Sequence, residues 1–283
     1  MQAISERVMR RFHDQGFVVV EGFCPADLVQ SARARFAPLF RGEFETGLQP
    51  DEWNWHPDRD PEDHARQICN AWKSDRAIAR LILRPEVGEA CARLMDWPGA
   101  RINQDNVIWK PPNARALGFH QDDSYQDWVV PPSMVTCWMA LDDTAADGGT
   151  IAYAPGSHRW RLSPMIAQFH APEDFTRDLR TAAAAAGARD FDLVAVEAKA
   201  GDAVFHHGRT WHGSAPNRSG AERRSVVAHC MSSEARFHPT NVGPIYGRYR
   251  RFDSDQMDES FFPILWTRTG GRSSFLEAYL DTK

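Results

Sequence analysis

The chain has 283 residues, of which 42% are hydrophobic and 25% charged, a balance typical of globular proteins and not of disordered ones. Its 33 basic and 38 acidic residues give a net charge of -5 without a basic run, so no nucleic-acid partner is expected. No stretch approaches the about 18 apolar residues that a membrane span requires, so no membrane partner is expected either. The length favours one large domain over residues 1–283.

The cysteines predict a reducing compartment. They are odd in number, scattered and free of C-x-x-C spacing, which is typical of reduced thiols in a cytoplasmic protein. Residues 1–12 mix charged with isolated apolar residues, so no secretory signal is expected. The oligomeric state is left open. The five cysteines are Cys24, Cys69, Cys91, Cys137 and Cys230.

Residues 1–99 are expected to be mostly helical and to pack on the rest of the domain. Apolar residues at helical spacing predict a helix over 4–15, which Gly16 ends, and a second one over 28–39. Residues 75–95 hold one or two further helices, broken near Pro85. The polar, tryptophan-bearing stretch 41–66 between them predicts a long loop.

From residue 100 to 235 the pattern changes to short β-rich runs between turn residues, interrupted by one predicted helix, Pro172–Ala186. Many short strands without regular helices between them favour a sandwich or barrel over a parallel α/β sheet. Residues 236–283 form an extension whose apolar residues are expected to pack on the barrel. The predicted strands are 17–20, 106–110, 134–141, 150–154, 191–196, 203–207 and 225–231.

A histidine and a carboxylate stand two residues apart in Gly118-Phe119-His120-Gln121-Asp122, at the end of a probable strand. Residues i and i+2 of a strand face the same side, so His120 and Asp122 can reach one metal ion. His212 follows a later strand and completes a set of two histidines and one carboxylate. Such a set holds iron(II) on one face and leaves positions open for a bidentate 2-oxo acid and dioxygen.

Arg223 lies eleven residues beyond His212, at the start of a predicted strand. A buried guanidinium can grip the distal carboxylate of 2-oxoglutarate through two parallel hydrogen bonds. Ser214 can add its hydroxyl to the same carboxylate. Taken alone, Arg223 and its neighbour Arg224 fit surface charges better. Of the adjacent His206 and His207, one must point inward, and packing is its expected role.

This order of motifs resembles the phytanoyl-CoA dioxygenase family of iron- and 2-oxoglutarate-dependent oxygenases. The resemblance implies a mainly β fold with flanking helices, built on a double-stranded β-helix of the jelly-roll, cupin-like type. It also implies His120, Asp122 and His212 as metal ligands that carry the catalysis, and Arg223, assisted by Ser214, as the co-substrate anchor. Gln104, before the H-x-D segment, resembles a further co-substrate contact.

The expected function is hydroxylation of a small organic substrate with iron(II), 2-oxoglutarate and O2, releasing succinate and CO2. A desaturating or cyclising member of the same family, and a cupin-like metalloenzyme that does not use 2-oxoglutarate, are the alternatives. Asp122 counts against halogenation, because halogenating members carry a small residue in its place. An intact triad counts against a ligand-binding barrel without activity. Tyr125, Trp128 and Trp138 are expected to line the substrate pocket, although Trp138 fits core packing equally well.

Overall fold

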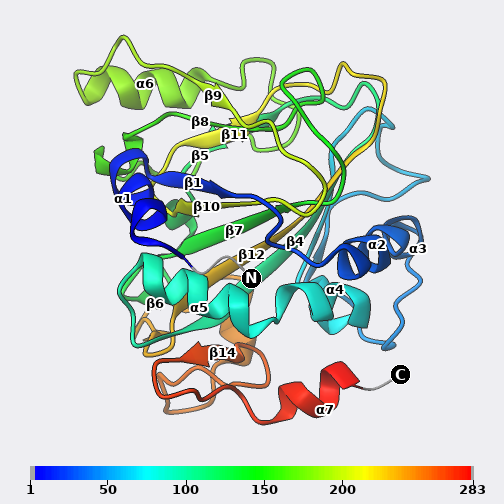
Figure 1. Ribbon diagram of the computed structural model, residues 1–283, viewed down its shortest axis with the longest axis vertical. Helices are drawn as coiled ribbons and strands as arrows, with labels where there is room; N and C mark the ends of the chain where they lie inside the picture. The colour runs from blue at the N-terminus through cyan, green and yellow to red at the C-terminus, as the bar shows by residue number, and fades with distance from the viewer. Residues whose placement is uncertain (1–3, 282–283) are drawn as a thin grey trace.

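The computed structural model describes residues 4–281, and the remaining residues of the predicted domain, 1–3 and 282–283, lie outside the described part. Figure 1 shows two sheets facing each other, with helices beyond them on either side. The α-helices are α1 (Glu6–Gln15), α2 (Ala26–Ala34), α3 (Phe36–Phe40), α4 (Arg76–Ile82), α5 (Pro85–Leu94), α6 (Arg177–Ala185) and α7 (Phe275–Asp281). Single 3-10 turns are η1 (Ala71–Lys73), η2 (Asp122–Tyr125), η3 (Ser157–Arg159) and η4 (Tyr246–Tyr249).

The major sheet is antiparallel. Its strands, in spatial order, are β1 (Phe17–Val20), β10 (Ala203–His207), β7 (Val135–Ala140), β12 (Arg223–Ser232), β4 (Gly99–Lys110), β3 (Arg66–Cys69) and β2 (Glu52–Trp53), with β14 (Ile264–Thr267) beside β4. The minor sheet runs β5 (Leu117–His120), β11 (His212–Ser214), β8 (Ile151–Tyr153) and β9 (Val194–Ala195). A short pair joins β6 (Val129–Val130) to β13 (Arg236–Phe237). The predicted double-stranded β-helix is therefore confirmed.

Local signals explain where the helices begin and end. The Ser5 hydroxyl accepts a hydrogen bond from the N–H of Val8 at the start of α1, and Gly16, at φ 82°, ends that helix in the left-handed region. Pro85 occupies the first turn of α5, so the segment 75–95 divides into two helices as expected. The predicted helix 28–39 is wrong in its continuity, because the regular helix is interrupted at Arg35, whose N–H donates to the Ala32 and Arg33 carbonyls between α2 and α3.

Side chains alternate in direction along the central strands, and this alternation determines which residues face the space between the two sheets. On β7, Cys137 and Met139 pack in the core between the major sheet and the helices, where α4 and α5 lie below the sheet in Figure 1. Trp138 and Ala140 face the opposite way, into the space between the two sheets. Since every residue of β7 is buried, the strand divides a helix-covered core from an inter-sheet interior.

The C-terminal segment packs on the barrel, as its apolar composition predicts. Strand β14 pairs with β4 through Ile264 and Arg101, and Phe262, Leu265 and Leu276 are buried. The segment therefore completes one end of the major sheet. Among residues 4–281, no helix is long and apolar enough to cross a bilayer.

Asp105, on β4, links the sheet to η1 and makes stability depend on pH. Its Oδ1 accepts a hydrogen bond from the Trp72 N–H at 3.1 Å, and Oδ2 has no hydrogen-bond partner within residues 4–281. Burial raises its pKa from 3.8 to about 7. The native state therefore holds this proton more tightly than the unfolded chain does, and stability falls as the pH rises from about 4 through about 7.

Asp105→Asn should remove this pH dependence, because the amide oxygen keeps the bond to Trp72 and carries no charge. The free energy of unfolding of the variant minus that of the wild type should increase by about 1–3 kcal/mol between about pH 5 and pH 8. Urea unfolding at both pH values measures the difference. A difference between the two proteins that stays constant with pH would contradict the assignment.

Candidate active site

His120 and His212 face each other as partners in the minor sheet, on β5 and β11. Strand β5 ends at His120, and the chain then enters η2, which begins at Asp122. The expectation that Asp122 continues the strand is therefore wrong, yet the turn brings its carboxylate to the same point. Its Oδ1 lies 3.3 Å from Nε2 of His120 and 3.5 Å from Nε2 of His212. One ligand atom from each residue lies within 4.8 Å of the others.

Backbone carbonyls set the tautomers of both histidines. Nδ1 of His120 lies 3.0 Å from the Gly118 carbonyl, and Nδ1 of His212 lies 2.9 Å from the Thr210 carbonyl. A carbonyl oxygen can only accept, so each Nδ1 carries the proton and each Nε2 keeps its lone pair. Both lone pairs then lie beside Oδ1 of Asp122, which is the arrangement a divalent metal requires.

The charges at this point also suit a metal ion. Burial by itself raises the pKa of Asp122, but the neighbouring His212 and His229 and the hydrogen bond from His206 lower that pKa well below 3.8. Burial lowers the pKa of His212 well below 6.5. An ionised carboxylate and a neutral imidazole are the ligand forms that bind metal.

A second polar centre lies where β12 starts. Arg223 is 3% exposed, its Nη1 donates to the Ser225 hydroxyl at 3.3 Å, and its Nε has no partner within residues 4–281. Its register partner Lys110 is fully buried and donates from Nζ to the Ser214 hydroxyl at 3.0 Å and to the Ala215 carbonyl. No carboxylate of the described chain lies within 4 Å of either cation.

Two adjacent buried cations without an anion are costly, and their pKa values show it. Burial lowers the pKa of Arg223 to about 10. Burial, and then the charge of Arg223, lower that of Lys110 well below 10.5. An anionic ligand held between the sheets would relieve both effects, so this end of the site is suited to a carboxylate.

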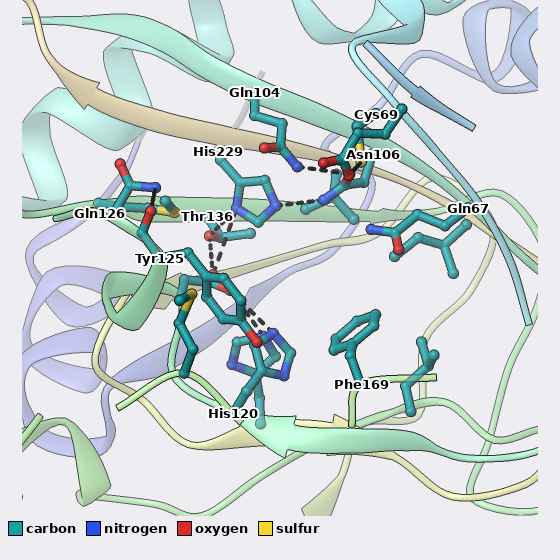
Figure 2. Close-up of a pocket in the computed structure, with 18 of the residues that line it drawn as sticks. Gln67, Cys69, Gln104, Asn106, His120, Tyr125, Gln126, Thr136, Phe169 and His229 are labelled. Atoms are coloured by element: carbon teal, nitrogen blue, oxygen red, sulfur yellow. Dashed lines mark hydrogen bonds and ion pairs between the residues drawn. The ribbon is translucent and has the colours of Figure 1, made fainter. Parts of the chain in front are cut away.

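One cavity of about 450 Å³ connects the two centres, a volume within the range of small-molecule sites. Figure 2 shows Tyr125 beside His120, with the two ring centroids 6.0 Å apart. In another part of the lining the Trp128 ring packs against that of Tyr246, with the centroids 4.6 Å apart and the rings tilted by 34°. The predicted residues that line the cavity are His120, Asp122, His212, Arg223, Ser214, Gln104, Tyr125, Trp128 and Trp138.

The structure places Trp138 and Gln104 in different parts of the cavity, which the sequence pattern did not predict. The Arg223 guanidinium lies 5.5 Å from the centre of the Trp138 ring, so Trp138 faces the cationic end of the cavity. Gln104 registers with His229, whereas Arg223 registers with Lys110, so Gln104 lies in the middle of β4, six residues from the register partner of Arg223. A contact between Gln104 and 2-oxoglutarate stays a prediction. Such a contact would involve a part of the co-substrate other than the distal carboxylate.

Sequence reasoning missed three polar residues and misjudged a fourth. His206 points inward as expected, but packing is not its only role, because its Nε2 lies 3.0 Å from Oδ2 of Asp122. Thr136 donates to the same oxygen at 2.6 Å. His229 lies on the same face of β12 as Arg223, six residues on, and Lys110 on the same face of β4 as Gln104. Strand alternation was the signal that could have found both.

The fold and the site together define a class: a cupin-like barrel with two histidines and one carboxylate gathered between its sheets. The chain belongs to the phytanoyl-CoA dioxygenase family, whose model "Phytanoyl-CoA dioxygenase (PhyH)" matches residues 12–225. The mouse protein "Phytanoyl-CoA dioxygenase, peroxisomal" is 24% identical over 238 residues, which cover 80% of this chain and 68% of that protein. The family prediction is therefore confirmed.

Solved structures share the fold. The non-haem α-ketoglutarate-dependent carbocyclase SnoK of nogalamycin biosynthesis is 24% identical, with a TM-score of 0.70 over 92% of this chain and 96% of that chain. The epimerase SnoN, in complex with Fe3+, α-ketoglutarate and nogalamycin RO, is 23% identical, with a TM-score of 0.70 over 92% and 98%. The named relatives catalyse different reactions on one fold. The cytoplasmic location of this chain stays a prediction.

Proposed function

We propose that this protein is an iron(II)- and 2-oxoglutarate-dependent dioxygenase that hydroxylates a small organic substrate. One observation carries the proposal: a single cavity joins three converging metal-ligand atoms to a buried guanidinium that no carboxylate pairs. A dianionic 2-oxo acid has the shape for both ends, since its keto-acid end chelates metal and its other carboxylate suits Arg223.

In this assignment His120, Asp122 and His212 hold the iron on one face. Iron, 2-oxoglutarate and O2 together supply the oxidation, and succinate and CO2 are the co-products. Arg223 binds the distal carboxylate, and Ser214, oriented by the bond from Lys110, can donate its hydroxyl to the same group. These contacts orient the co-substrate before O2 arrives.

The substrate would lie beside the metal, where Tyr125 contributes to the wall, and Trp128 lines the same cavity further from the ligands. Aromatic walls exclude water and present flat apolar surfaces to an organic molecule. The fold and the triad are equally compatible with ring closure or epimerisation, the reactions in the names of SnoK and SnoN. We favour hydroxylation, and product mass distinguishes it by the gain of one oxygen atom.

A metalloenzyme that does not use 2-oxoglutarate is the second candidate. It would leave Arg223 and Lys110 buried without an anion, which is why we rank it lower.

The test is succinate formation by purified protein supplied with iron(II), ascorbate, 2-oxoglutarate and a panel of small metabolites, with product masses recorded. Succinate should form only with iron(II), and a hydroxylated product should appear with the matching metabolite. Removing the metal with a chelator should abolish both, and iron(II) should restore them. Full turnover in the chelated sample, or products without succinate, would contradict the proposal.

A further inference from the structure

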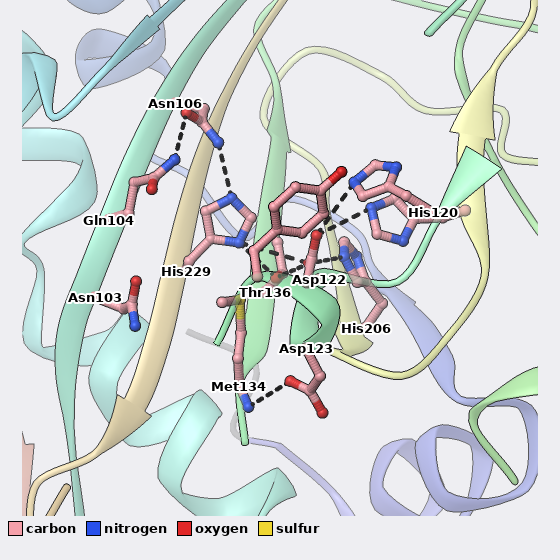
Figure 3. A network of polar contacts seen from close by, with 12 residues as sticks. Asn103, Gln104, Asn106, His120, Asp122, Asp123, Met134, Thr136, His206 and His229 are labelled. Atoms are coloured by element: carbon pink, nitrogen blue, oxygen red, sulfur yellow. Dashed lines mark hydrogen bonds and ion pairs between the residues drawn. The ribbon is translucent and has the colours of Figure 1, made fainter. Parts of the chain in front are cut away.

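The Oδ2 oxygen of Asp122, which faces away from His120 and His212, receives two chains of hydrogen bonds. Thr136 donates to it at 2.6 Å and His206 lies 3.0 Å from it (Figure 3). The strand register produces this convergence, because Gln104, His229, Thr136 and His206 are successive partners across β4, β12, β7 and β10. These four residues lie side by side across the major sheet, and two of them, Thr136 and His206, contact the same carboxylate oxygen.

The direction of the first chain follows from the chemistry of its end. An ionised carboxylate only accepts, so the Thr136 hydroxyl gives its proton to Asp122. Nδ1 of His229, 2.8 Å from the same hydroxyl oxygen, must then be the donor. Nε2 of His229 is left with a lone pair, which accepts from the Asn106 amide at 2.9 Å.

The same logic extends to the cavity wall. The Asn106 carbonyl accepts from the Gln104 amide at 3.0 Å, and the Gln104 carbonyl accepts from the Tyr246 hydroxyl. Every donor from Tyr246 to Thr136 therefore points toward Asp122. Tyr246, Gln104 and Asn106 all line the cavity, and Tyr246 lies beyond residues 12–225, the part that the family model matches.

The second chain is shorter and points the same way. Nε2 of His206 donates to Asp122, so Nδ1 of His206 carries the lone pair and accepts from the Tyr153 hydroxyl at 2.9 Å. His206 and Tyr153 are buried, and the Tyr153 ring stacks on Phe17 at 4.4 Å. Aligned bonds in a buried site polarise and strengthen one another.

We propose that Thr136 and His206 are positioning residues for the metal: they occupy Oδ2 of Asp122 and thereby direct Oδ1 toward the two histidines as a single-atom ligand. His229, Asn106, Gln104 and Tyr246 hold Thr136 in its donating rotamer. This inference rests on the proposed function for the metal site and adds the residues that shape it. Without the two donors, Asp122 can rotate or offer both oxygens to the metal.

Cobalt(II) binding tests the inference without turnover, because the cobalt absorption spectrum reports the number and arrangement of ligands. Thr136→Val keeps the side-chain shape and removes the donor. It should weaken cobalt binding by about 10-fold or more and alter the spectrum, as expected when an outer partner of a metal ligand is lost. His206→Phe should do the same through the second chain.

Matched variants separate positioning from loss of packing or of a buried hydroxyl. Thr136→Ser should restore the wild-type affinity and spectrum. Thr144→Val removes another buried threonine hydroxyl, one with no hydrogen-bond partner in the described chain, and should leave both unchanged. Tyr246→Phe, at the far end of the longer chain, should have a smaller effect than Thr136→Val.

Circular dichroism and thermal unfolding of each metal-free variant identify those that fold. If Thr136→Val does not fold, His206→Phe provides the test. Wild-type cobalt affinity and spectrum in a folded Thr136→Val or His206→Phe variant would overturn the inference. Wild-type protein that binds cobalt but forms no succinate under any condition would count against the proposed function alone. Wild-type protein that does not bind cobalt would overturn both.

Discussion

Asp122→Ala is expected to lower succinate formation and hydroxylation by more than about 100-fold, because outer partners of metal ligands alone are worth about 10–100-fold. The change removes Oδ1, which lies within 3.5 Å of both histidine Nε2 atoms. It also removes the acceptor toward which Thr136 and His206 point. Iron(II) titration of the metal-free variant, followed by the succinate assay, measures both losses.

High chloride should restore little of the lost activity, even though the variant opens a position at the metal. Transfer of a halide also requires the substrate to lie closer to the halide than to the oxygen ligand, and the substitution of Asp122 does not by itself move the substrate. Product mass with and without chloride decides the point.

Asp123→Asn is the matched control for this experiment. Oδ1 of Asp123 accepts from the Met134 N–H at 2.9 Å, and Figure 3 shows it pointing away from His120. An amide oxygen can keep that bond, so the variant should retain iron binding and turnover. Hydroxylation that persists in Asp122→Ala would remove Asp122 from the ligand set and with it the central claim.

Arg223→Ala should leave the fold and the metal site intact and raise the KM for 2-oxoglutarate by at least about 30-fold. A buried charge-assisted pair is worth on the order of 2–5 kcal/mol, and 2 kcal/mol corresponds to a factor of about 30. The KM of Arg223→Lys for 2-oxoglutarate should lie between those of the wild type and Arg223→Ala, because an ammonium cannot form the two parallel bonds of a guanidinium. Calorimetric titration of 2-oxoglutarate into the iron-loaded protein without O2 checks binding directly.

The neighbouring arginine provides the control. Arg224 points to the other face of β12 and donates from Nε to Asp142 at 2.8 Å. Arg224→Ala should therefore change stability slightly and leave the KM for 2-oxoglutarate unaltered. An unchanged KM in Arg223→Ala would move the anchor elsewhere, and Lys110 is the next buried cation at that end.

The sequence by itself determined the order of the elements and the identity of the residues that could bind metal and co-substrate. Strand alternation, Gly16 and Pro85 are local signals, because capping, backbone conformation and side-chain direction depend on a few neighbouring residues. The H-x-D segment, His212 and Arg223 were recognisable for the same reason: each is a short motif, and their order along the chain was informative.

Only the tertiary structure decided how these residues meet. The turn after β5 that brings Asp122 to the histidines, and the carbonyls that set the histidine tautomers, depend on backbone paths that no local pattern specifies. Thr136 and His229 are 93 residues apart, and Lys110 and Ser214 are 104 apart. The Thr136–His229 contact arises from strand register, and the Lys110–Ser214 contact arises where the two sheets face each other. A one-residue slip of register would turn each of these side chains to the opposite face. Register is set by the packing of the whole barrel, and so the polar surroundings of Asp122 emerge only when the barrel closes.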